Sequence, residues 1–188
     1  KTSRLVRGTD AGLYRLIPKA VVKVNNEEEA IRLIKYCYNN LAPITFKAAG
    51  TSLSGQTITD SILMEMGNGF EFAAIRDNGT LATFGPAITG GAANRLLKRF
   101  KRKLGPKPAS IDSAKIGGIV SNNASGANYG ILYNSYNTIQ SMRIIMHDGT
   151  LLDTGDKESC DNFRKSHATL LKEIIALRDD AIHNKDIK

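Results

Sequence analysis

The most constraining feature of this sequence is a strand–helix–strand pattern close to its N-terminus. Residues 20–24 (AVVKV) form a short, mostly β-branched run that is typical of a strand. Asn26 followed by Glu29 is a capping-box pattern with Asn in the place of Ser or Thr, and apolar residues then recur at helical spacing as far as Leu41. Residues 44–47 (ITFK) predict a second strand. Two strands joined through a helix over so short a distance form a βαβ unit, so we expect them to be parallel.

The rest of the chain predicts short strands and further helices. The run Asp77, Asn78, Gly79 between two apolar segments predicts a hairpin, because Asn and Gly accept positive φ. A second hairpin is expected around Asp148 and Gly149. The expected strands cover 62–66, 72–76, 81–84, 139–146 and 151–152, and the expected helices cover 92–104 and 170–182. The predicted fold class is therefore α+β, with a βαβ start and antiparallel strands later.

Length and composition narrow the class of protein. The 188 residues suit one domain or one two-lobed domain, at roughly 100–200 residues per domain. With 26 Lys and Arg against 18 Asp and Glu, the formal net charge is +8, which favours anionic partners without choosing among them. No apolar run approaches the roughly 20 residues that a membrane-spanning helix needs. Because the chain begins with Lys and stops in polar sequence, we expect it to be a piece of a longer protein.

The two cysteines lie far apart and carry no partner motif. Cys37 and Cys160 therefore exclude a disulfide scaffold and a Cys-based metal site within this chain. This usage favours a cytoplasmic, reducing compartment.

Residues 48–57 (AAGTSLSGQT) directly follow the second predicted strand and are rich in small residues. Gly and Ser let a backbone approach a ligand closely, and successive N–H groups in such a turn form an anion-binding concavity. The segment from Gly50 to Thr57 differs from the phosphate loop of nucleotide hydrolases, because Gln56 stands at the lysine position and a strand, not a helix, is expected next. We therefore predict that this loop holds a diphosphate in another kind of site.

A second small-residue-rich stretch runs from 105 to 126. It contains GPKPAS at 105–110, the pair Gly117 and Gly118, and NNASG at 122–126. These residues allow close backbone approach and leave room for a flat ring. Since no Gly-x-Gly-x-x-Gly stands between a strand and a helix, a Rossmann dinucleotide site is not supported. Tight turns in a protein without such a ligand are the plainer alternative, although such turns need only one or two small residues.

These motifs, in this order, resemble the flavin-binding domain of the vanillyl-alcohol oxidase and p-cresol methylhydroxylase (PCMH-type) superfamily. Within it, they are most similar to the FAD-linked oxidases of the D-lactate dehydrogenase and glycolate oxidase type. The resemblance covers nearly all of residues 4–155. One difference is that Lys47 and Ala48 stand where relatives commonly have Arg-Gly, and another is Lys107 where an acidic residue is frequent. The motifs that carry the resemblance are GTDA at 8–11 with Tyr14, Arg15 and Pro18, GTSLSGQ at 50–56, GPKPAS at 105–110, IGG at 116–118 and NASG at 123–126.

The resemblance implies a two-lobed α+β domain with FAD held non-covalently between the lobes. The N-terminal lobe would cover about 1–84, and the second, incomplete lobe about 85–188. The first loop would hold the pyrophosphate through backbone N–H groups, the second stretch would line the ribityl chain and the isoalloxazine, and Ile144 would lie near the adenine. The cofactor-binding residues implied in this way are Ala49, Gly50, Thr51, Ser52, Gly55, Gln56, Pro108, Ala109, Ser110, Gly117, Gly118, Asn123, Ala124, Ser125, Gly126 and Ile144.

The activity implied by the resemblance is oxidation of a 2-hydroxy acid of the D-lactate or glycolate type to a 2-oxo acid. Electrons would pass on to a quinone, a cytochrome, an iron–sulfur centre or another protein. Relatives hold the substrate, the base and sometimes a metal in a cap domain that this chain does not reach, so no catalytic residue and no metal site is assigned and the piece alone is expected to be inactive. His147, His167 and His183 are expected to be solvent or packing histidines, because none has the oriented partner that a base needs.

Residues 95–103 (RLLKRFKRK) form the strongest cationic run. A nucleic-acid-binding module centred on 95–107 and without flavin is the alternative function. A solvated helix face explains the run more simply, so nucleic acid is the less favoured partner. For the intact protein, peripheral attachment to the inner membrane through these charges stays open beside a free cytoplasmic location. The apolar residues of this run, expected on one helical face, are Leu96, Leu97, Phe100 and Leu104.

Overall fold

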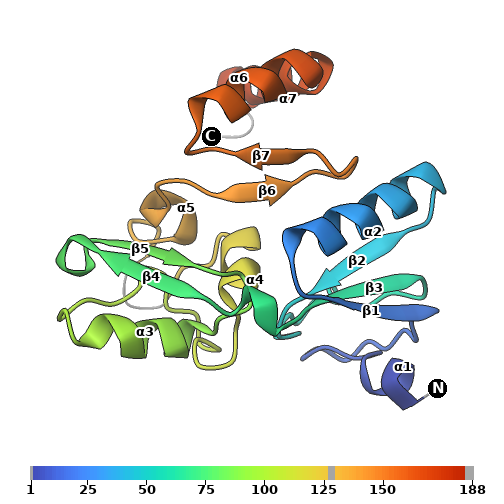
Figure 1. Cartoon of the computed structure of the whole chain (residues 1–188), viewed down its shortest axis with the longest axis horizontal. Coiled ribbons are helices and arrows are strands. Elements are labelled where there is room, and N and C mark those ends of the chain that lie inside the picture. The colour runs from blue at the N-terminus through green and yellow to red at the C-terminus, as the bar shows by residue number, and fades with distance from the viewer. Residues whose placement is uncertain (1, 127–129, 185–188) are drawn as a thin grey trace. The chain divides into compact units, whose positions relative to one another are not determined.

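The computed structural model of the protein describes residues 2–126 and 130–184 (Figure 1). Contacts group the chain into two compact units, which we describe separately. Unit 1 comprises residues 1–139 and the turn at 147–149, and unit 2 comprises residues 140–146 and 150–188. Within the described residues, no helix is long and apolar enough to cross a membrane.

Unit 1 begins with a short helix and a three-stranded parallel sheet. These elements are α1 (Thr2–Val6), β1 (Ala20–Val24), α2 (Glu27–Asn39), β2 (Ile44–Lys47) and β3 (Ile62–Met66). The strand order is β1–β3–β2, and Ala20 and Ile44 both stand beside Ile62. The predicted common direction of β1 and β2 is confirmed, while the later strand β3 lies between them. Leu63 and Met64 of this central strand are buried, as befits a strand with neighbours on both sides.

α2 starts where the capping-box pattern predicted. The Asn26 side chain accepts a hydrogen bond from the Glu29 amide at 2.8 Å, and the Glu29 carboxylate accepts one from the Asn25 amide at 2.8 Å. The expected helical position of Leu41 is wrong, because α2 ends at Asn39 and Leu41 has a φ of 50° and an exposed side chain. The proline two residues further on cannot continue a helix. The buried face of α2 carries Ala30, Ile34 and Cys37.

The other elements of unit 1 include the first predicted hairpin. They are η1 (Asn68–Phe70), β4 (Ala73–Arg76), η2 (Asp77–Gly79), β5 (Leu81–Phe84), α3 (Gly90–Lys98), α4 (Ile116–Ser121) and α5 (Ser135–Thr138). β4 and β5 pair antiparallel, which confirms the hairpin, and Asn78 and Gly79 have φ of 51° and 82°. The turn packs against the chain after α3 (Figure 1), where a Cβ at Gly79 would fall 2.5 Å from the Cβ of Phe100.

α3 is shorter than the helix predicted over 92–104. It ends at Lys98, Lys101 has a φ of 56°, and the Arg102 amide bonds to the Leu97 carbonyl at 3.3 Å, which closes the helix end. Leu97 is buried, whereas the cations of the run are exposed. The cationic run is therefore divided between the last turn of α3 and the loop that follows, and Leu104 lies outside the helix.

The glycine pair that was expected in a loop lies in α4. Backbone hydrogen bonds from Ile116 to Ile88 (2.9 Å) and from Gly117 to Pro86 (3.0 Å) fix the start of this helix. A Cβ at Gly117 would lie 2.9 Å from the Cβ of Pro86, so only glycine fits there without a shift. These partners are distant in the sequence, which is why the local pattern did not reveal the helix.

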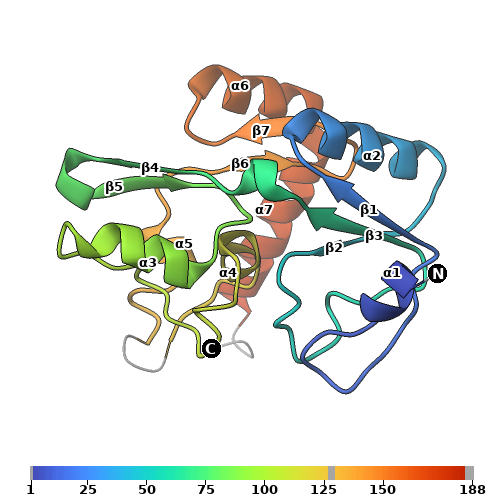
Figure 2. The same cartoon turned by 60° about the horizontal axis from the view of Figure 1, so that its bottom comes forward.

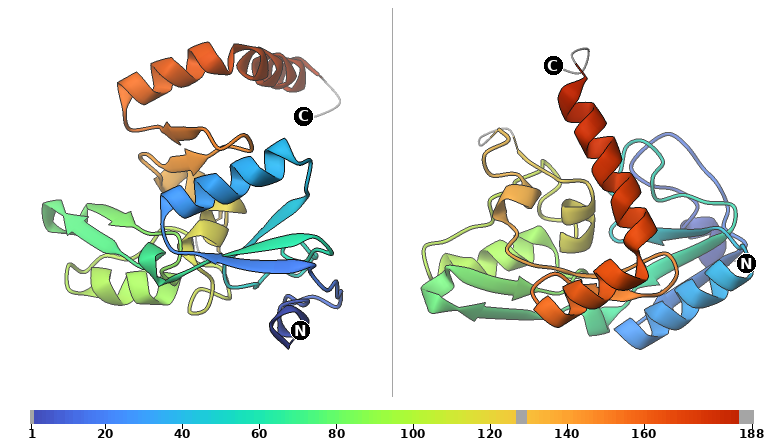
Figure 3. Two further views of the ribbon diagram at one scale, coloured as in Figure 1. Left: turned by 45° about the vertical axis from the view of Figure 1, so that its right-hand side comes forward. Right: turned by 90° about the horizontal axis from the view of Figure 1, so that it is seen from above.

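Unit 2 consists of a hairpin and two helices. Its elements are β6 (Arg143–Ile145), β7 (Leu151–Asp153), α6 (Lys157–Ser166) and α7 (Ala168–His183). β6 and β7 pair antiparallel, which confirms the second predicted hairpin, although β6 is shorter than expected. α7 covers the helix predicted over 170–182, whereas α6 was not predicted; Figure 3 shows both.

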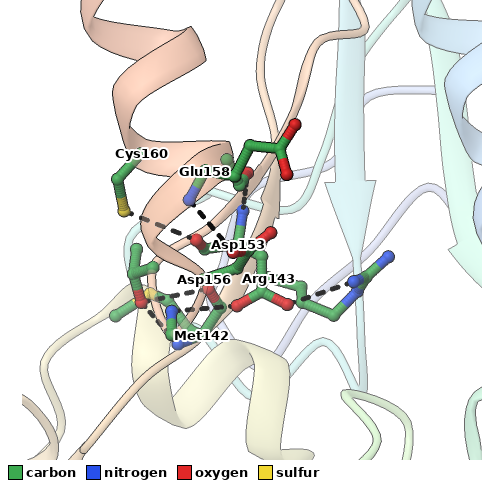
Figure 4. Close-up of polar contacts among 9 residues, drawn as sticks. Met142, Arg143, Asp153, Asp156, Glu158 and Cys160 are labelled. Carbon is green, nitrogen blue, oxygen red and sulfur yellow. Dashed lines mark hydrogen bonds and ion pairs between the residues drawn. The ribbon is translucent and has the colours of Figure 1, made fainter.

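Asp153 joins the hairpin of unit 2 to α6 (Figure 4). Its carboxylate contacts Arg143 at 3.1 Å, its amide donates to Ser159 Oγ at 3.0 Å, and its carbonyl accepts a bond from Cys160 Sγ at 3.5 Å. The Asp156 side chain caps the first turn of α6. These polar contacts fix α6 directly after the hairpin.

The α+β fold-class prediction is confirmed by the parallel sheet followed by antiparallel hairpins. The loop between β2 and β3 starts at the carboxyl end of a parallel strand. Ligands of α/β sheets generally bind beyond the carboxyl ends of such strands, so this loop is in a suitable place for a site.

Candidate functional site

The loop between β2 and β3, residues 48–61, depends on glycine at two positions. Gly50 and Gly55 have φ of +69° and +78°, in the left-handed region that other residues rarely adopt. The Ser52 hydroxyl bonds to the Gln56 side-chain carbonyl, and the Gly55 carbonyl accepts the Ile58 amide at 3.3 Å. No helix follows the loop, which agrees with the exclusion of a nucleotide-hydrolase phosphate loop.

This loop presents backbone amides without protein partners. The amides of Gly50, Thr51, Ser52 and Leu53 donate to no protein atom among the described residues. Thr57 Oγ1 is buried and likewise finds no partner within residues 2–126 and 130–184. Buried polar groups are hydrogen-bonded as a rule, so an orphaned hydroxyl at the end of such a loop indicates a ligand with acceptor atoms. Successive donors of this kind suit an anion.

Lys47, the last residue of β2, ties the strand to the N-terminal segment. Its Nζ donates to the carbonyl oxygens of Arg7 at 3.2 Å and Thr9 at 2.5 Å. Burial lowers the pKa of Lys47 from its ordinary value, and nearby carboxylates, above all Glu65, oppose that shift. The Lys47 cation thus has a structural role.

Asp10 belongs to the GTDA motif at 8–11 that resembles the family, but the sequence alone predicted no role for it. Its carboxylate accepts hydrogen bonds from the Gly12 amide at 2.7 Å and from the Gly55 amide at 3.1 Å. The signal available in the sequence was an acid placed two residues before a glycine, a pattern that favours local turns through the side chain. Its long-range partner in the loop carried no local signal.

The two motifs of the second stretch lie side by side. The Lys107 amide donates to the Ser125 carbonyl at 3.0 Å, and a Cβ at Gly126 would fall 2.3 Å from the Lys107 carbonyl oxygen. The Ala124 carbonyl accepts both the amide and the hydroxyl of Ser135, at 2.9 and 3.0 Å. Segments 105–110 and 123–126, expected to line one ligand, are therefore neighbours.

Several predicted site residues also shape this stretch. The Asn123 side-chain oxygen accepts the Tyr136 amide at 3.0 Å. The Ser110 carbonyl accepts the amides of Ser113 and Ala114 at 2.9 and 2.7 Å. These bonds turn the chain, while contact of the same residues with a cofactor stays a prediction.

α4 brings the second stretch against the first loop. A Cβ built on Gly118 lies 3.7 Å from the Cβ of Ala48 and, apart from its chain neighbours and the nearby backbone of α4, meets no other described atom within 4 Å. The side chains of Ala49 and Gln56 are exposed in the loop. Of the remaining predicted residues, Pro108 and Ala109 lie in the turn before Ile111, and Ile144 is the middle residue of β6 in unit 2.

The histidines have local partners. The His147 ring packs edge-on against Tyr38 with centroids 5.4 Å apart, and His167 stacks on Phe163 at 4.2 Å. His183 Nδ1 bonds to the carbonyl four residues earlier at 2.6 Å. These contacts suit packing and surface roles, and the catalytic base stays unassigned.

Unit 2 contains a cavity of about 320 Å³ beside α6. Among the described residues, its lining includes Asp156 and Glu158 and no Lys or Arg. Two negative charges without a cation disfavour a diphosphate. This cavity is therefore a poor site for the ligand that the loop of unit 1 suits.

The βαβ sheet, the glycine loop at the end of β2 and the paired small-residue segments define a domain that binds a nucleotide cofactor. The sequence profile of the FAD binding domain family matches residues 18–155, and the chain belongs to this family. The family falls within the PCMH-type superfamily indicated by the motifs, and its cofactor is FAD. The alternative of a module without flavin is therefore set aside.

Curated relatives are similar over most of this chain. The D-2-hydroxyglutarate dehydrogenase of Haemophilus influenzae is 23% identical over 178 residues, which cover 90% of this chain and 17% of the relative. The glycolate oxidase subunit GlcD of Bacillus subtilis is 25% identical over 160 residues, 82% of this chain and 33% of the relative. The GlcD of Escherichia coli is 26% identical over 147 residues, 76% and 29%. The chain thus spans between 17% and 33% of the length of these relatives.

Solved structures share the fold at low sequence identity. An alkyldihydroxyacetonephosphate synthase matches with a TM-score of 0.66 and 18% identity over 84% of this chain and 31% of its own. The 6-hydroxy-D-nicotine oxidase of Arthrobacter nicotinovorans matches with a TM-score of 0.69 and 13% identity over 79% of this chain and 32% of its own. These likenesses confirm the PCMH-type fold.

The residues present fit FAD on grounds independent of the family match. FAD carries a diphosphate, and the unpartnered amides of Gly50 to Leu53 together with the orphaned Thr57 hydroxyl supply donors for it. Gly50 and Gly55, where a positive φ favours glycine, leave the loop backbone without a side chain at two positions.

Proposed function

We propose that this chain is the FAD-binding part of an enzyme that oxidises a 2-hydroxy acid to a 2-oxo acid. The observation that carries the proposal is the row of unpartnered amides at residues 50–53 in the glycine loop of an FAD binding domain. The substrate class is supported by the names of the relatives, since D-2-hydroxyglutarate and glycolate both bear a hydroxyl beside a carboxylate. D-Lactate, the substrate type expected from the motifs, belongs to the same class.

In this proposal, each segment of the chain has a separate task toward the cofactor. The loop at 49–56 binds the pyrophosphate through its N–H groups, and the small residues between 108 and 126 leave room for the ribityl chain and the ring. Ile144 lies near the adenine. Bound FAD supplies the two-electron oxidant. Residues 1–84 and 85–188 form the two lobes of the domain.

Substrate recognition and electron transfer are assigned outside this chain. The substrate carboxylate, the base and any metal belong to a cap domain, and a quinone, cytochrome or iron–sulfur centre takes the electrons. We place the protein in the cytoplasm, free or peripheral to the inner membrane, because both cysteines are unpaired thiols.

FAD binding is the first test. The protein is unfolded thermally alone, with FAD, with riboflavin and with duplex DNA. We expect stabilisation by FAD, reaching about 2.7 kcal/mol at a concentration 100 times the Kd, and less by riboflavin, which lacks the diphosphate. Absence of stabilisation by FAD, with salt-dependent binding of DNA in its place, would overturn the proposal.

The substrate class is tested on the whole protein loaded with FAD. Anaerobic addition of D-2-hydroxyglutarate, glycolate or D-lactate is expected to bleach the visible flavin absorbance, whereas the corresponding 2-oxo acids leave it unchanged. Flavin that is reduced by dithionite but by none of the three hydroxy acids would contradict the assigned class.

A further inference from the structure

The N-terminal residues 7–14, which we call the strap, run beside the loop at 50–56 (Figure 2). The family match begins at residue 18, so the strap lies outside the matched domain. Both segments belong to unit 1. The contacts between them concentrate on a few groups.

Two hydrogen bonds cross from the strap to the loop. The Ala11 amide donates to the Ser52 carbonyl at 3.0 Å. The Asp10 carboxylate accepts the Gly55 amide at 3.1 Å with one oxygen and the amide of Gly12 at 2.7 Å with the other. One carboxylate therefore fixes a turn of the strap and one end of the loop at the same time, and hydrogen bonds to a charged acceptor are the stronger kind.

Close packing accompanies these bonds. A Cβ at Gly12 would fall 2.7 Å from the Leu53 carbonyl oxygen, so the strap approaches the loop as closely as a glycine allows. A Cβ at Gly55 would lie 3.7 Å from the Tyr14 ring. The strap thus contacts the loop at Ser52, Leu53 and Gly55.

The strap is itself anchored to the sheet. Lys47 Nζ, at the end of β2, holds the carbonyls of Arg7 and Thr9. The Arg7 side chain pairs with Glu65 of β3 at 2.6 Å, and the Glu65 side chain is largely buried. The strap is therefore a firm support, because two neighbouring strands hold its first residues.

The loop has few bonds of its own. Within the part of the chain that the structure describes, its internal bonds are those of Ser52 with Gln56, Ser54 with Ser52, and Ile58 with Gly55. The strap hydrogen-bonds to the Ser52 carbonyl and the Gly55 amide. The amides of residues 50–53 stay unpartnered.

We propose that the strap, acting through Asp10, holds the loop in the shape that directs its unpartnered amides toward the FAD diphosphate. Asp10 is a positioning residue, and its carboxylate acts on the cofactor only through the loop. The part of this inference that concerns FAD rests on the proposed function. The part that concerns the loop itself does not.

The first experiment measures hydrogen exchange of the protein without FAD. Asp10→Asn keeps one acceptor oxygen but removes the charge and the second acceptor. The matched control is Asp60→Asn, because Asp60 is exposed and its side chain bonds to none of the described residues. We expect exchange of the hydrogen-bonded amides in peptides covering 50–58, those of Ser54, Gly55 and Ile58, to rise roughly tenfold in Asp10→Asn, as loss of one charge-assisted bond implies, and to stay at the wild-type rate in Asp60→Asn. Unchanged protection of the loop overturns the proposal, and so does a uniform rise across unit 1, which a merely structural role would produce.

The second experiment measures the Kd for FAD by quenching of flavin fluorescence. Asp10→Asn is expected to raise the Kd roughly tenfold or more, and Asp60→Asn to change it less than twofold. Equal or tighter binding by Asp10→Asn means that the carboxylate does not position the loop for the diphosphate and overturns the proposal. If Asp10→Asn does not fold, Gly12→Ala is used, since its Cβ pushes the strap away from Leu53. If the wild-type protein does not bind FAD, the proposed function fails, and the exchange experiment still decides whether the strap holds the loop.

Discussion

The Cβ position of Gly118 lies 3.7 Å from the Cβ of Ala48, so the first turn of α4 stands against the start of the loop that follows β2. Two small-residue segments far apart in the sequence therefore meet in unit 1. Because Gly118 lacks a side chain, the backbone of α4 approaches the start of the loop closely. This is the contact that a cofactor shared by both segments requires.

Gly118→Ala is expected to separate stability from cofactor affinity. The new methyl group meets only ordinary contacts, and Ala is favoured over Gly in a helix by roughly 0.5–1 kcal/mol, so the protein without FAD gains stability of that order. The methyl group also narrows the space beside Ala48, and we expect the Kd for FAD to rise. Urea unfolding with and without FAD measures both effects.

Gly117→Ala is the contrasting variant for stability. Its Cβ would lie 2.9 Å from the Cβ of Pro86, so, unlike Gly118→Ala, it is expected to destabilise the protein without FAD by about 1–3 kcal/mol. A Gly118→Ala protein that binds FAD as tightly as the wild type would argue against the shared site.

Gly55→Val is expected to abolish FAD uptake while the fold is retained. Gly55 has a φ of +78°, where a β-branched residue is strained by about 1–3 kcal/mol, and the loop relieves this strain by changing shape. The Cβ itself would meet Ile58 and Tyr14 at an ordinary 3.7 Å, so the effect comes from the backbone more than from a clash. Circular dichroism and flavin absorbance after gel filtration report fold and uptake. Ser54→Val, at an exposed neighbouring position, should keep its flavin, and retention of flavin by Gly55→Val would count against the loop.

The elements that could be predicted from the sequence are those with local causes. α2 begins at Asn26 because a side chain three residues away completes its cap, and the first hairpin turns at Asn78 because the residues there accept positive φ. The order β1–β3–β2 could not be predicted in this way, because the pairing of Ile62 with both Ala20 and Ile44 depends on contacts across the sheet. Local sequence determines that a strand forms, and packing determines its neighbours.

In the candidate site, too, the features with local causes could be predicted and those that depend on distant partners could not. The glycine loop was visible in the sequence because its composition is unusual. α4 could not be predicted because the hydrogen bonds that start it are made to Ile88 and Pro86, far earlier in the sequence. The role of Asp10 could not be predicted because its partner, Gly55, is likewise distant along the chain, beyond β1, α2 and β2. α6 was a different kind of omission, because the Asp156 cap that starts it is a local signal that could have been used.

Thr57→Val tests the orphaned hydroxyl. The Thr57 Oγ1 is buried and bonds to no described protein atom, so an apolar group of the same shape should stabilise the protein without FAD by about 1 kcal/mol. If the hydroxyl donates to the cofactor, the same change raises the Kd for FAD, and the gain in stability is reversed when FAD is present. Thermal unfolding of wild type and variant with increasing FAD gives both values. A variant that is more stable by the same amount at every FAD concentration would show that the hydroxyl does not contact the cofactor.

Cys37 gives the protein a pH dependence of known sign. The thiol is 2% exposed on the buried face of α2, and this burial raises its pKa above the ordinary value because the thiolate is poorly solvated there. A raised pKa in the folded state means that the unfolded chain loses its proton first, so the contribution to stability is complete below the unfolded pKa and is lost as the pH rises through the folded pKa. We expect the free energy of unfolding in urea to fall with rising alkaline pH more steeply in the wild type than in Cys37→Val, which keeps an apolar side chain and has no proton to lose. The half-buried Cys160 should react with a thiol reagent in the native protein, while Cys37 reacts only on unfolding. Parallel pH profiles of wild type and Cys37→Val would show that this thiol does not carry the alkaline loss, which would then belong to other groups that titrate there.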